Sequence, residues 1–142
     1  MTQLVLPSHT NALGSVFGGT IMSWIDIAAA ICAQRHSNKE VVTASIDRID
    51  FVAPVYKGWV VNLKASVNFT SRTSMEVGVR VDAEDPKTGE TFHTASAYTT
   101  FVALGANGKP IEVPGLDLQS DDDKRRYEEA KARRAARLSN KK

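Results

Sequence analysis

The sequence predicts an α+β fold, an antiparallel sheet of about five strands wrapped around one long central helix, with a C-terminal helical tail. Three observations support this prediction: one apolar segment without glycine or proline, several later segments of alternating apolar and polar residues, and a highly charged terminal segment. One buried helix followed by successively connected strands is typical of a sheet that curls around the helix. Because one helix covers only part of such a sheet, we expect edge-to-edge pairing with a second copy.

The central helix is expected over residues 20–34, TIMSWIDIAAAICAQ. The segment is too long for an ordinary strand, and its density of apolar residues favours a helix. Its large apolar side chains surround the helix axis instead of forming one stripe, which is typical of a buried helix. They are Ile21, Met22, Trp24, Ile25, Ile27 and Ile31. Cys32, the single cysteine, lies in the same segment and is interpreted as a small core residue.

Strands are expected where apolar and polar residues alternate, because successive side chains of a strand point to opposite faces. The expected strands are 3–6, 41–52, 59–69, 74–84 and 90–104. In the second of them Ile46 and Ile49 fall in opposite phases, which predicts a bulge near Asp47 and Arg48. The side chains expected to face the helix are Val61, Leu63, Ala65, Val67 and Phe69 in the third strand and Met75, Val77, Val79 and Val81 in the fourth.

Length and charge indicate one domain with a distinct tail. A chain of 142 residues buries roughly 68–70% of its unfolded surface, so we expect a core that needs no disulfide or structural metal. The formal net charge is +2, but residues 117–142 carry nine basic and six acidic side chains, so residues 1–116 are nearly neutral. We therefore expect a domain at 1–116 and a charged tail at 117–142, and no nucleic-acid partner.

The tail is expected to form a helix from Ser120 onward. Ser120 is a favourable N-cap, and the aspartates at 121–123 suit the positive end of the helix dipole. Tyr127 and Leu138 are its only large apolar residues, so a solvated helix is the simpler interpretation. The alternative is that its basic residues contact an anionic ligand or a neighbouring subunit.

Asp26 is the main candidate for chemistry, because it is the only acidic residue between positions 12 and 39 and lies within the apolar helix. Burial of a carboxylate without partners is costly, so its presence there needs an explanation. One explanation is structural: Asp26 faces a solvent channel or pairs with Arg35 or His36. The other is functional, as a general base or nucleophile in an active site.

Two glycines, Gly18 and Gly19, directly precede the expected helix. Glycine lets a ligand approach the backbone closely, and the free N–H groups of a first helical turn attract anionic oxygen. With a carboxylate further along the helix, the pair resembles an oxyanion hole that faces a base. Asp26 lies seven residues after Gly19, roughly 10 Å along a helix. Because both groups must lie near one reacting carbonyl, we expect a composite site in which Gly19 of one protomer faces Asp26 of another.

Four motifs follow one another between residues 11 and 77. They are N-A-L-G-S-V-F-G-G-T-I-M-S-W-I-D at 11–26, V-V-T-A-S-I-D-R-I-D-F at 41–51, P-V at 54–55 and R-T-S-M-E-V at 72–77. Together they resemble the hotdog-fold acyl-CoA thioesterases, of the cytosolic acyl-CoA hydrolase type with its small single-domain bacterial relatives. The resemblance covers roughly residues 1–115 and implies a hotdog fold for the domain.

The resemblance implies hydrolysis of acyl-CoA to a free carboxylic acid and CoA, a reaction of fatty acid metabolism, without a metal or redox cofactor. It implies catalytic roles for Asp26 and for Asn11, which acts from the partner domain. It places the CoA nucleotide beside Arg72, Thr73 and Ser74. It also implies dimers that commonly assemble as trimers of dimers, a hexamer, in agreement with the composite site expected from helix geometry.

Some positions depart from the family or are weaker candidates. Glycine is frequent where this chain has Ser71, and an acidic residue often follows the glycine at position 58, where this chain has Trp59. The first departure changes the loop expected beside CoA. Lys57 and Lys109 are further candidates for the CoA phosphates, although each lysine is more simply a solvated surface residue. Thr43 is a candidate for a hydrogen bond near the site.

Two alternative functions stay open on the sequence. A hotdog hydratase or dehydratase commonly uses a catalytic histidine, and residues 12–35 contain none. A non-catalytic acyl-CoA-binding module or regulator has little need for a carboxylate beside a glycine pair. His9, His36 and His93 lack the spacing of metal ligands, so no metal site is expected. Acyl chain preference depends on how Phe17, Met22 and Trp24 shape a pocket.

The location expected from the sequence is the cytoplasm. The first residues, MTQLVLPSHTN, do not have the basic start and apolar stretch of a secretory signal. The longest apolar segment, 21–33, is interrupted by Ser23 and Asp26 and is too short to span a bilayer. We therefore expect no membrane span.

Overall fold

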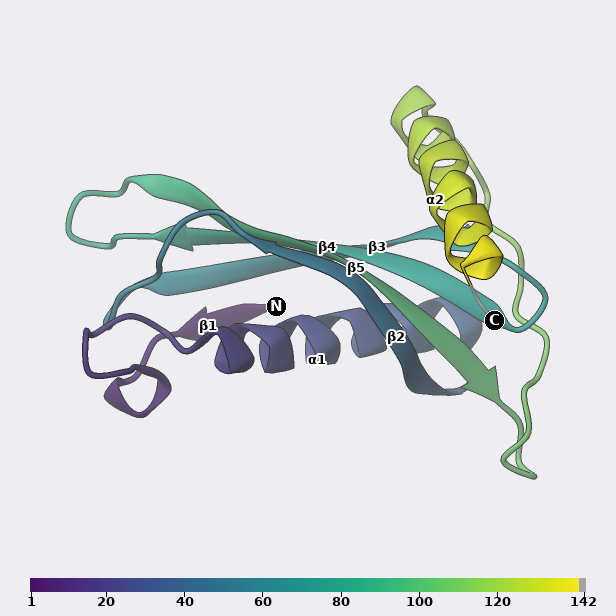
Figure 1. Cartoon of the computed structure of the whole chain (residues 1–142), viewed down its shortest axis with the longest axis horizontal. Coiled ribbons are helices and arrows are strands. Elements are labelled where there is room, and N and C mark those ends of the chain that lie inside the picture. The colour runs from purple at the N-terminus through teal and green to yellow at the C-terminus, as the bar shows by residue number, and fades with distance from the viewer. Residues whose placement is uncertain (141–142) are drawn as a thin grey trace.

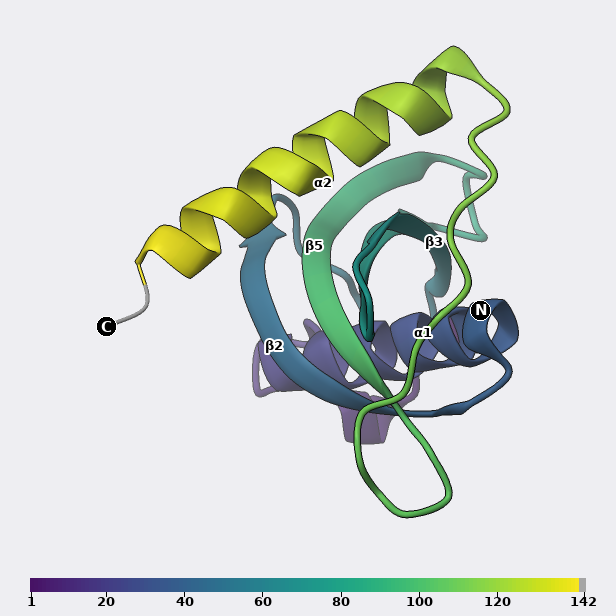
Figure 2. The same cartoon turned by 90° about the vertical axis from the view of Figure 1, so that its right-hand side faces the viewer.

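The computed structural model describes residues 1–140 and has the predicted α+β arrangement. Its elements are β1 (Thr2–Leu4), the 3-10 helix η1 (Pro7–His9), α1 (Gly18–Ser37), β2 (Glu40–Phe51), β3 (Val60–Thr70), β4 (Ser74–Glu84), β5 (Thr91–Leu104) and α2 (Asp121–Ser139). The strands form one antiparallel sheet in the order β1-β3-β4-β5-β2. The sheet curls around α1, and α2 crosses its outer face (Figures 1 and 2).

Helix α1 is longer than predicted at both ends. It begins at Gly18 and ends at Ser37, after which Asn38 takes a left-handed backbone conformation with φ 56°. Asparagine tolerates this conformation and so ends helices well. The prediction that α1 is buried on all sides is wrong for one side: Met22, Ile27 and Ile31 are exposed in the single chain. The other side of the helix faces the sheet.

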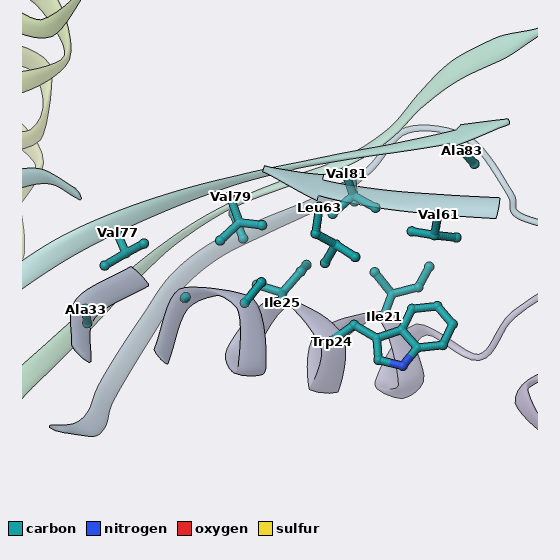
Figure 3. Close-up of a cluster of buried hydrophobic side chains, with 14 of the residues drawn as sticks. Ile21, Trp24, Ile25, Ala33, Val61, Leu63, Val77, Val79, Val81 and Ala83 are labelled. Carbon is teal, nitrogen blue, oxygen red and sulfur yellow. The ribbon is translucent and has the colours of Figure 1, made fainter. Parts of the chain in front are cut away.

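The core lies between α1 and the concave face of the sheet. Ile21, Trp24 and Ile25 of α1 point towards Val61 and Leu63 of β3, with valines of β4 beside them (Figure 3). Burial of each large apolar side chain contributes about 1.5–3 kcal/mol to folding. The central helix is therefore fixed by apolar packing, and Trp24 belongs to the core.

Irregularities in the strand register affect which side chains face the helix. The predicted bulge in β2 is confirmed, because the register with β5 shifts between Ile46 and Arg48. The shift between Val67 and Phe69 of β3 was not predicted. It leaves Phe69 outside the core cluster, with its ring 4.9 Å from that of Tyr127 in α2. The prediction that Phe69 faces α1 is therefore wrong.

The first strand is also shifted from its predicted bounds. It spans Thr2–Leu4 instead of 3–6, and the chain then enters η1, which was not predicted. Pro7 occupies the first turn of η1, and the ring of His9 accepts a hydrogen bond from the backbone N–H of Leu6 at 3.0 Å. Proline at a first helical position is favourable because its missing N–H is not needed there.

Helix α2 is confirmed, including its N-cap: the Ser120 hydroxyl accepts from the Asp123 N–H at 3.0 Å. The expectation of a fully solvated helix is wrong, because α2 packs on the outer face of the sheet. Ala130 is buried, and Arg133 forms an ion pair of 2.7 Å with Glu76 of β4. The guanidinium of Arg133 also lies 3.7 Å from the centre of the Tyr98 ring.

Candidate functional site

Asp26 lies on the third turn of α1 and faces the edge strand β2. The hydroxyl of Thr43 donates a hydrogen bond of 2.7 Å to Asp26 Oδ1. Within residues 1–140, Asp26 Oδ2 accepts no hydrogen bond, and the carboxylate is half-buried. Asp26 does not pair with His36, because the His36 ring contacts the carbonyl of Pro114 at 2.8 Å. The arrangement holds one carboxylate oxygen and leaves the other available.

The surface around Asp26 is apolar and exposed. On α1 it includes Met22, Ile27 and Ile31, and on β2 it includes Val42 and Phe51. Strand β2 is the last strand of the sheet, so one side of it has unpaired backbone groups. Apolar side chains beside an open strand edge are typical of an interface between protein chains. Asp26 therefore lies at the margin of a surface suited to a second copy.

Asn11 organises the loop that leads into α1. Its Oδ1 accepts hydrogen bonds from the N–H groups of Leu13 and Ser15, at 2.9 and 3.3 Å. Its Nδ2 donates to the Ser15 hydroxyl at 3.0 Å. The loop is fixed in turn to the segment before β3, because the N–H of Lys57 donates to the carbonyl of Gly14 at 3.2 Å. Asn11 thus has a defined position before any partner is present.

Gly19 is the second residue of α1 and is exposed. Phe17, the N-cap, supplies no side-chain hydrogen bond, and the N–H groups of Gly18 and Gly19 have no acceptor in the described part of the chain. A Cβ added at Gly19 would meet nothing within 4 Å. A hollow of about 300 Å³ lies beside this turn, between Gly18 and the segment 51–55. Free donors beside an open hollow can bind anionic oxygen.

Arg72, Thr73 and Ser74 form the turn from β3 to β4. The carbonyl of Arg72 accepts from Val113 N–H, and that of Thr73 accepts from Ala103 N–H, both at 3.0 Å. The Arg72 side chain is exposed, and it forms no ion pair among residues 1–140. This turn therefore combines a fixed backbone with an available cation.

The predicted site residues do not all meet in one chain. Asp26 and Thr43 are in contact. The start of α1, which includes Gly19, and the loop before it, which includes Asn11, lie at one end of the molecule, and the β3–β4 turn lies at the opposite end (Figure 1). The hydrogen bond that the sequence suggested for Thr43 is present, with Asp26 as its acceptor. Sequence reasoning missed the hydrogen bonds between Asn11 and Ser15, whose only signal is the short polar spacing typical of a turn.

A nucleophilic cysteine and a metal centre are two other chemical possibilities. Burial raises the pKa of the Cys32 thiol above its ordinary value, against smaller opposing effects of a Val67 backbone hydrogen bond and the charge of Arg35. A raised thiol pKa disfavours the nucleophilic thiolate. In the described chain, no three histidine, cysteine or acidic side chains are grouped as metal ligands.

None of the helices within residues 1–140 has the length and apolar character needed to cross a membrane.

Comparison with known proteins gives consistent matches. The family model described as "Thioesterase superfamily" matches residues 13–90, more than half of the chain. The cytosolic acyl coenzyme A thioester hydrolase of Rattus norvegicus is 41% identical over 136 residues, which are 94% of this chain and 35% of that protein. The chain thus spans about a third of the length of this relative.

Solved structures match over nearly the whole chain. An apo hexameric acyl-CoA thioesterase is 45% identical with a TM-score of 0.94, covering 98% of this chain and 89% of the other. The acyl-CoA hydrolase of Staphylococcus aureus, solved with butyryl-CoA and CoA, is 38% identical with a TM-score of 0.87, covering 98% and 87%. Separate mutants of that enzyme carry alanine in place of one asparagine, one aspartate and one threonine. These positions are 15 and 17 residues apart in order, the same spacing as Asn11, Asp26 and Thr43.

Proposed function

Because the chain belongs to the thioesterase superfamily, we propose that it is an acyl-CoA thioesterase, which hydrolyses acyl-CoA to a carboxylic acid and CoA. The observation that carries this proposal is the Asp26 carboxylate, held at one oxygen by Thr43 and uncommitted at the other, on the exposed margin of an apolar helix. A carboxylate so placed can act on a thioester in two ways. It activates water as a general base, or it attacks the carbonyl carbon as a nucleophile.

The active site is composite in this proposal. Asp26 of one protomer faces Asn11 and the first turn of α1 in its partner across paired β2 edges. The partner's Asn11 orients the water or the acyl group, and the N–H groups near Gly19 stabilise the developing oxyanion. Support comes from the separation of these groups within one chain and from the exposed apolar surface around Asp26.

The proposed substrate site continues at the β3–β4 turn. Arg72, Thr73 and Ser74 provide one cation, two hydroxyl groups and a backbone fixed by Val113, which suit the phosphates of CoA. The functional unit in this proposal is a dimer, and three dimers form a hexamer. Support comes from the solved thioesterases of similar structure that are described as hexameric. The proposed location is the cytoplasm, in line with the description of the rat relative as cytosolic.

The first test replaces the carboxylate. Asp26→Asn preserves the size of the side chain and the Thr43 contact but removes the base. We expect kcat for acyl-CoA hydrolysis to fall about 10²–10⁴-fold, measured as CoA thiol release with DTNB. Asp50→Asn, an exposed carboxylate of β2, is the matched control and should retain activity. Full activity of Asp26→Asn overturns the proposal, and binding of acyl-CoA by wild-type protein without thiol release indicates a non-catalytic acyl-CoA-binding module instead.

The composite site has a test of its own. Asn11→Ala and Asp26→Ala chains are each expected to be inactive alone. When the two are co-refolded, half of the dimers contain both variants, and each mixed dimer has one intact site by two-fold symmetry. About a quarter of wild-type activity should therefore return. If both groups acted from the same chain, mixing would restore nothing.

Thr43 is proposed as a positioning residue for Asp26. Thr43→Val keeps the shape of the side chain but removes the donor at 2.7 Å, so we expect kcat to fall about tenfold with little change in KM. Thr43→Ser retains the hydroxyl and should restore most of the activity. Equal activity of the valine and serine variants would show that the hydrogen bond has no part in the reaction.

A further inference from the structure

A second hollow lies on the outer face of the sheet, away from Asp26, and the proposed function makes no use of it. Its volume is about 420 Å³, and β3, β4, β5 and α2 all contribute to its walls. Gly78 of β4 forms part of its floor: a Cβ at this position would lie 2.6 Å from Asn68 Nδ2. The missing side chain therefore leaves room for the Asn68 amide beside the hollow.

Within residues 1–140, five cations from three elements line this hollow, and one of them, Arg133, is already paired with Glu76. Lys64 of β3 stands directly opposite Arg80 of β4, and Arg125 and Arg126 of α2 line the same space. Like charges directly opposite on neighbouring strands are destabilising unless something compensates them. Glu129 is the only acidic residue among those that line the hollow.

Within residues 1–140, the ion pairs around the hollow leave much of this positive charge unpaired or weakly paired. Arg80 contacts Asp82 only through Nε, at 3.1 and 3.2 Å, and its terminal nitrogens have no acceptor within residues 1–140. Lys64 takes part in none of the ion pairs found in that range. Arg125 and Arg126 reach carboxylates of their own helix only at 3.5–3.8 Å. Such exposed pairs are weak and exchange readily for a stronger anion.

A neutral donor also lines the hollow. Asn68 is only 5% exposed, and its Oδ1 accepts a hydrogen bond of 3.1 Å from the Ser66 hydroxyl. Its Nδ2 donates no hydrogen bond in the part of the chain that the structure describes. An acceptor oxygen within the hollow would satisfy it.

From these contacts we propose that the outer hollow binds an anion that carries two or more phosphate groups. One phosphate is held by the Lys64 and Arg80 pair with a hydrogen bond from Asn68, and the next by Arg125 and Arg126. The volume suits a small molecule and not a folded partner. The same diphosphate chemistry occurs in CoA and in free diphosphates, so the test separates these sources.

The probe is inorganic pyrophosphate, titrated into the full chain by calorimetry at low ionic strength without divalent cations. Lys64→Gln/Arg80→Gln should weaken binding by about tenfold for each cation replaced. Arg126→Glu, which changes only α2, should also weaken it. The matched control is Lys87→Gln/Lys131→Gln, which removes two exposed lysines outside the hollow. Unchanged affinity in the Lys64 and Arg80 variant, equal loss in the control, or no binding by wild-type protein overturns the proposal.

A competition experiment identifies the source of the diphosphate. If saturating CoA displaces pyrophosphate and the Lys64 and Arg80 variant raises KM for acyl-CoA at constant kcat, the hollow holds the phosphates of CoA. If pyrophosphate binds equally well with CoA present, the hollow is a separate site for a free diphosphate. Either result supports the proposal. Because Asp26→Asn is assayed by thiol release alone, failure of the anion site and failure of the proposed function are distinguishable.

Discussion

Helices α1 and α2 contact opposite faces of the same sheet and are held there by different interactions (Figure 1). Helix α1 is fixed by apolar packing, with Ile25 fully buried against the concave face. Helix α2 buries only Ala130 and is attached to the convex face mainly by charged and aromatic contacts. Apolar packing of α1 should depend little on pH or salt, whereas attachment of α2 should depend on both. The proposed catalytic carboxylate lies on α1, the helix whose attachment should depend less on pH and salt.

The largest effect that tests this comparison is expected in α1. Ile25→Ala removes a fully buried side chain and should lower the free energy of unfolding by about 2–5 kcal/mol, measured by urea denaturation. Leu138→Ala, on the exposed surface of α2, should change it by less than about 0.5 kcal/mol. Both measurements need the same protomer concentration, because association shifts apparent stability. Similar losses for the two variants would contradict the difference between the helices.

The parts of the fold that depend on local pattern were predicted well. The density of apolar residues located α1, and the phase change between Ile46 and Ile49 located the bulge in β2. Asp26 stood out because it is the only acid in an apolar segment, and the structure gives it the Thr43 partner suggested for the site. Each of these features is visible in a short window of sequence.

The parts that depend on distant contacts were not predictable in the same way. Phe69 follows Val67 in regular alternation, so nothing in the sequence indicates the register shift that turns it to the outer face. Docking of α2 depends on Arg133 meeting Glu76, 57 residues earlier in the chain. The three-dimensional fit between a charged helix and a sheet decides which turn of the helix contacts the sheet. The composition of the helix alone favours a solvated helix.

A pH effect is expected where α2 meets β4. Burial raises the pKa of Glu76 above its ordinary value, and the charge of Asp47 raises it further, against the opposing effects of Arg133 and Arg137. A carboxyl whose pKa is higher in the folded state stabilises the fold below the unfolded value of 4.5, and this stabilisation is lost as pH rises through the folded value. The stability of wild-type protein relative to Glu76→Gln should therefore decrease between pH 4 and pH 7.

Urea denaturation of both proteins at several pH values in this range measures the difference. Glu128→Gln, an exposed substitution on α2, is the matched control for the loss of one carboxyl group. If wild-type protein instead gains stability relative to Glu76→Gln as pH rises, the ion pair with Arg133 outweighs the cost of burying the charge. Attachment of α2 would then be driven by the charged pair itself.

The smallest effect is expected at the second ion pair of α2. Arg137 lies 2.7 Å from Asp47, but the side chains are 24% and 26% exposed, so water and salt screen their attraction. Arg137→Ala should lower the free energy of unfolding by about 0.5 kcal/mol at low salt and by less at high salt. A double-mutant cycle with Asp47→Ala isolates the pair from other losses. A coupling energy that persists at high salt would mean that this end of α2 excludes solvent as effectively as the apolar side of α1 does, and the contrast between the two helices would not hold there.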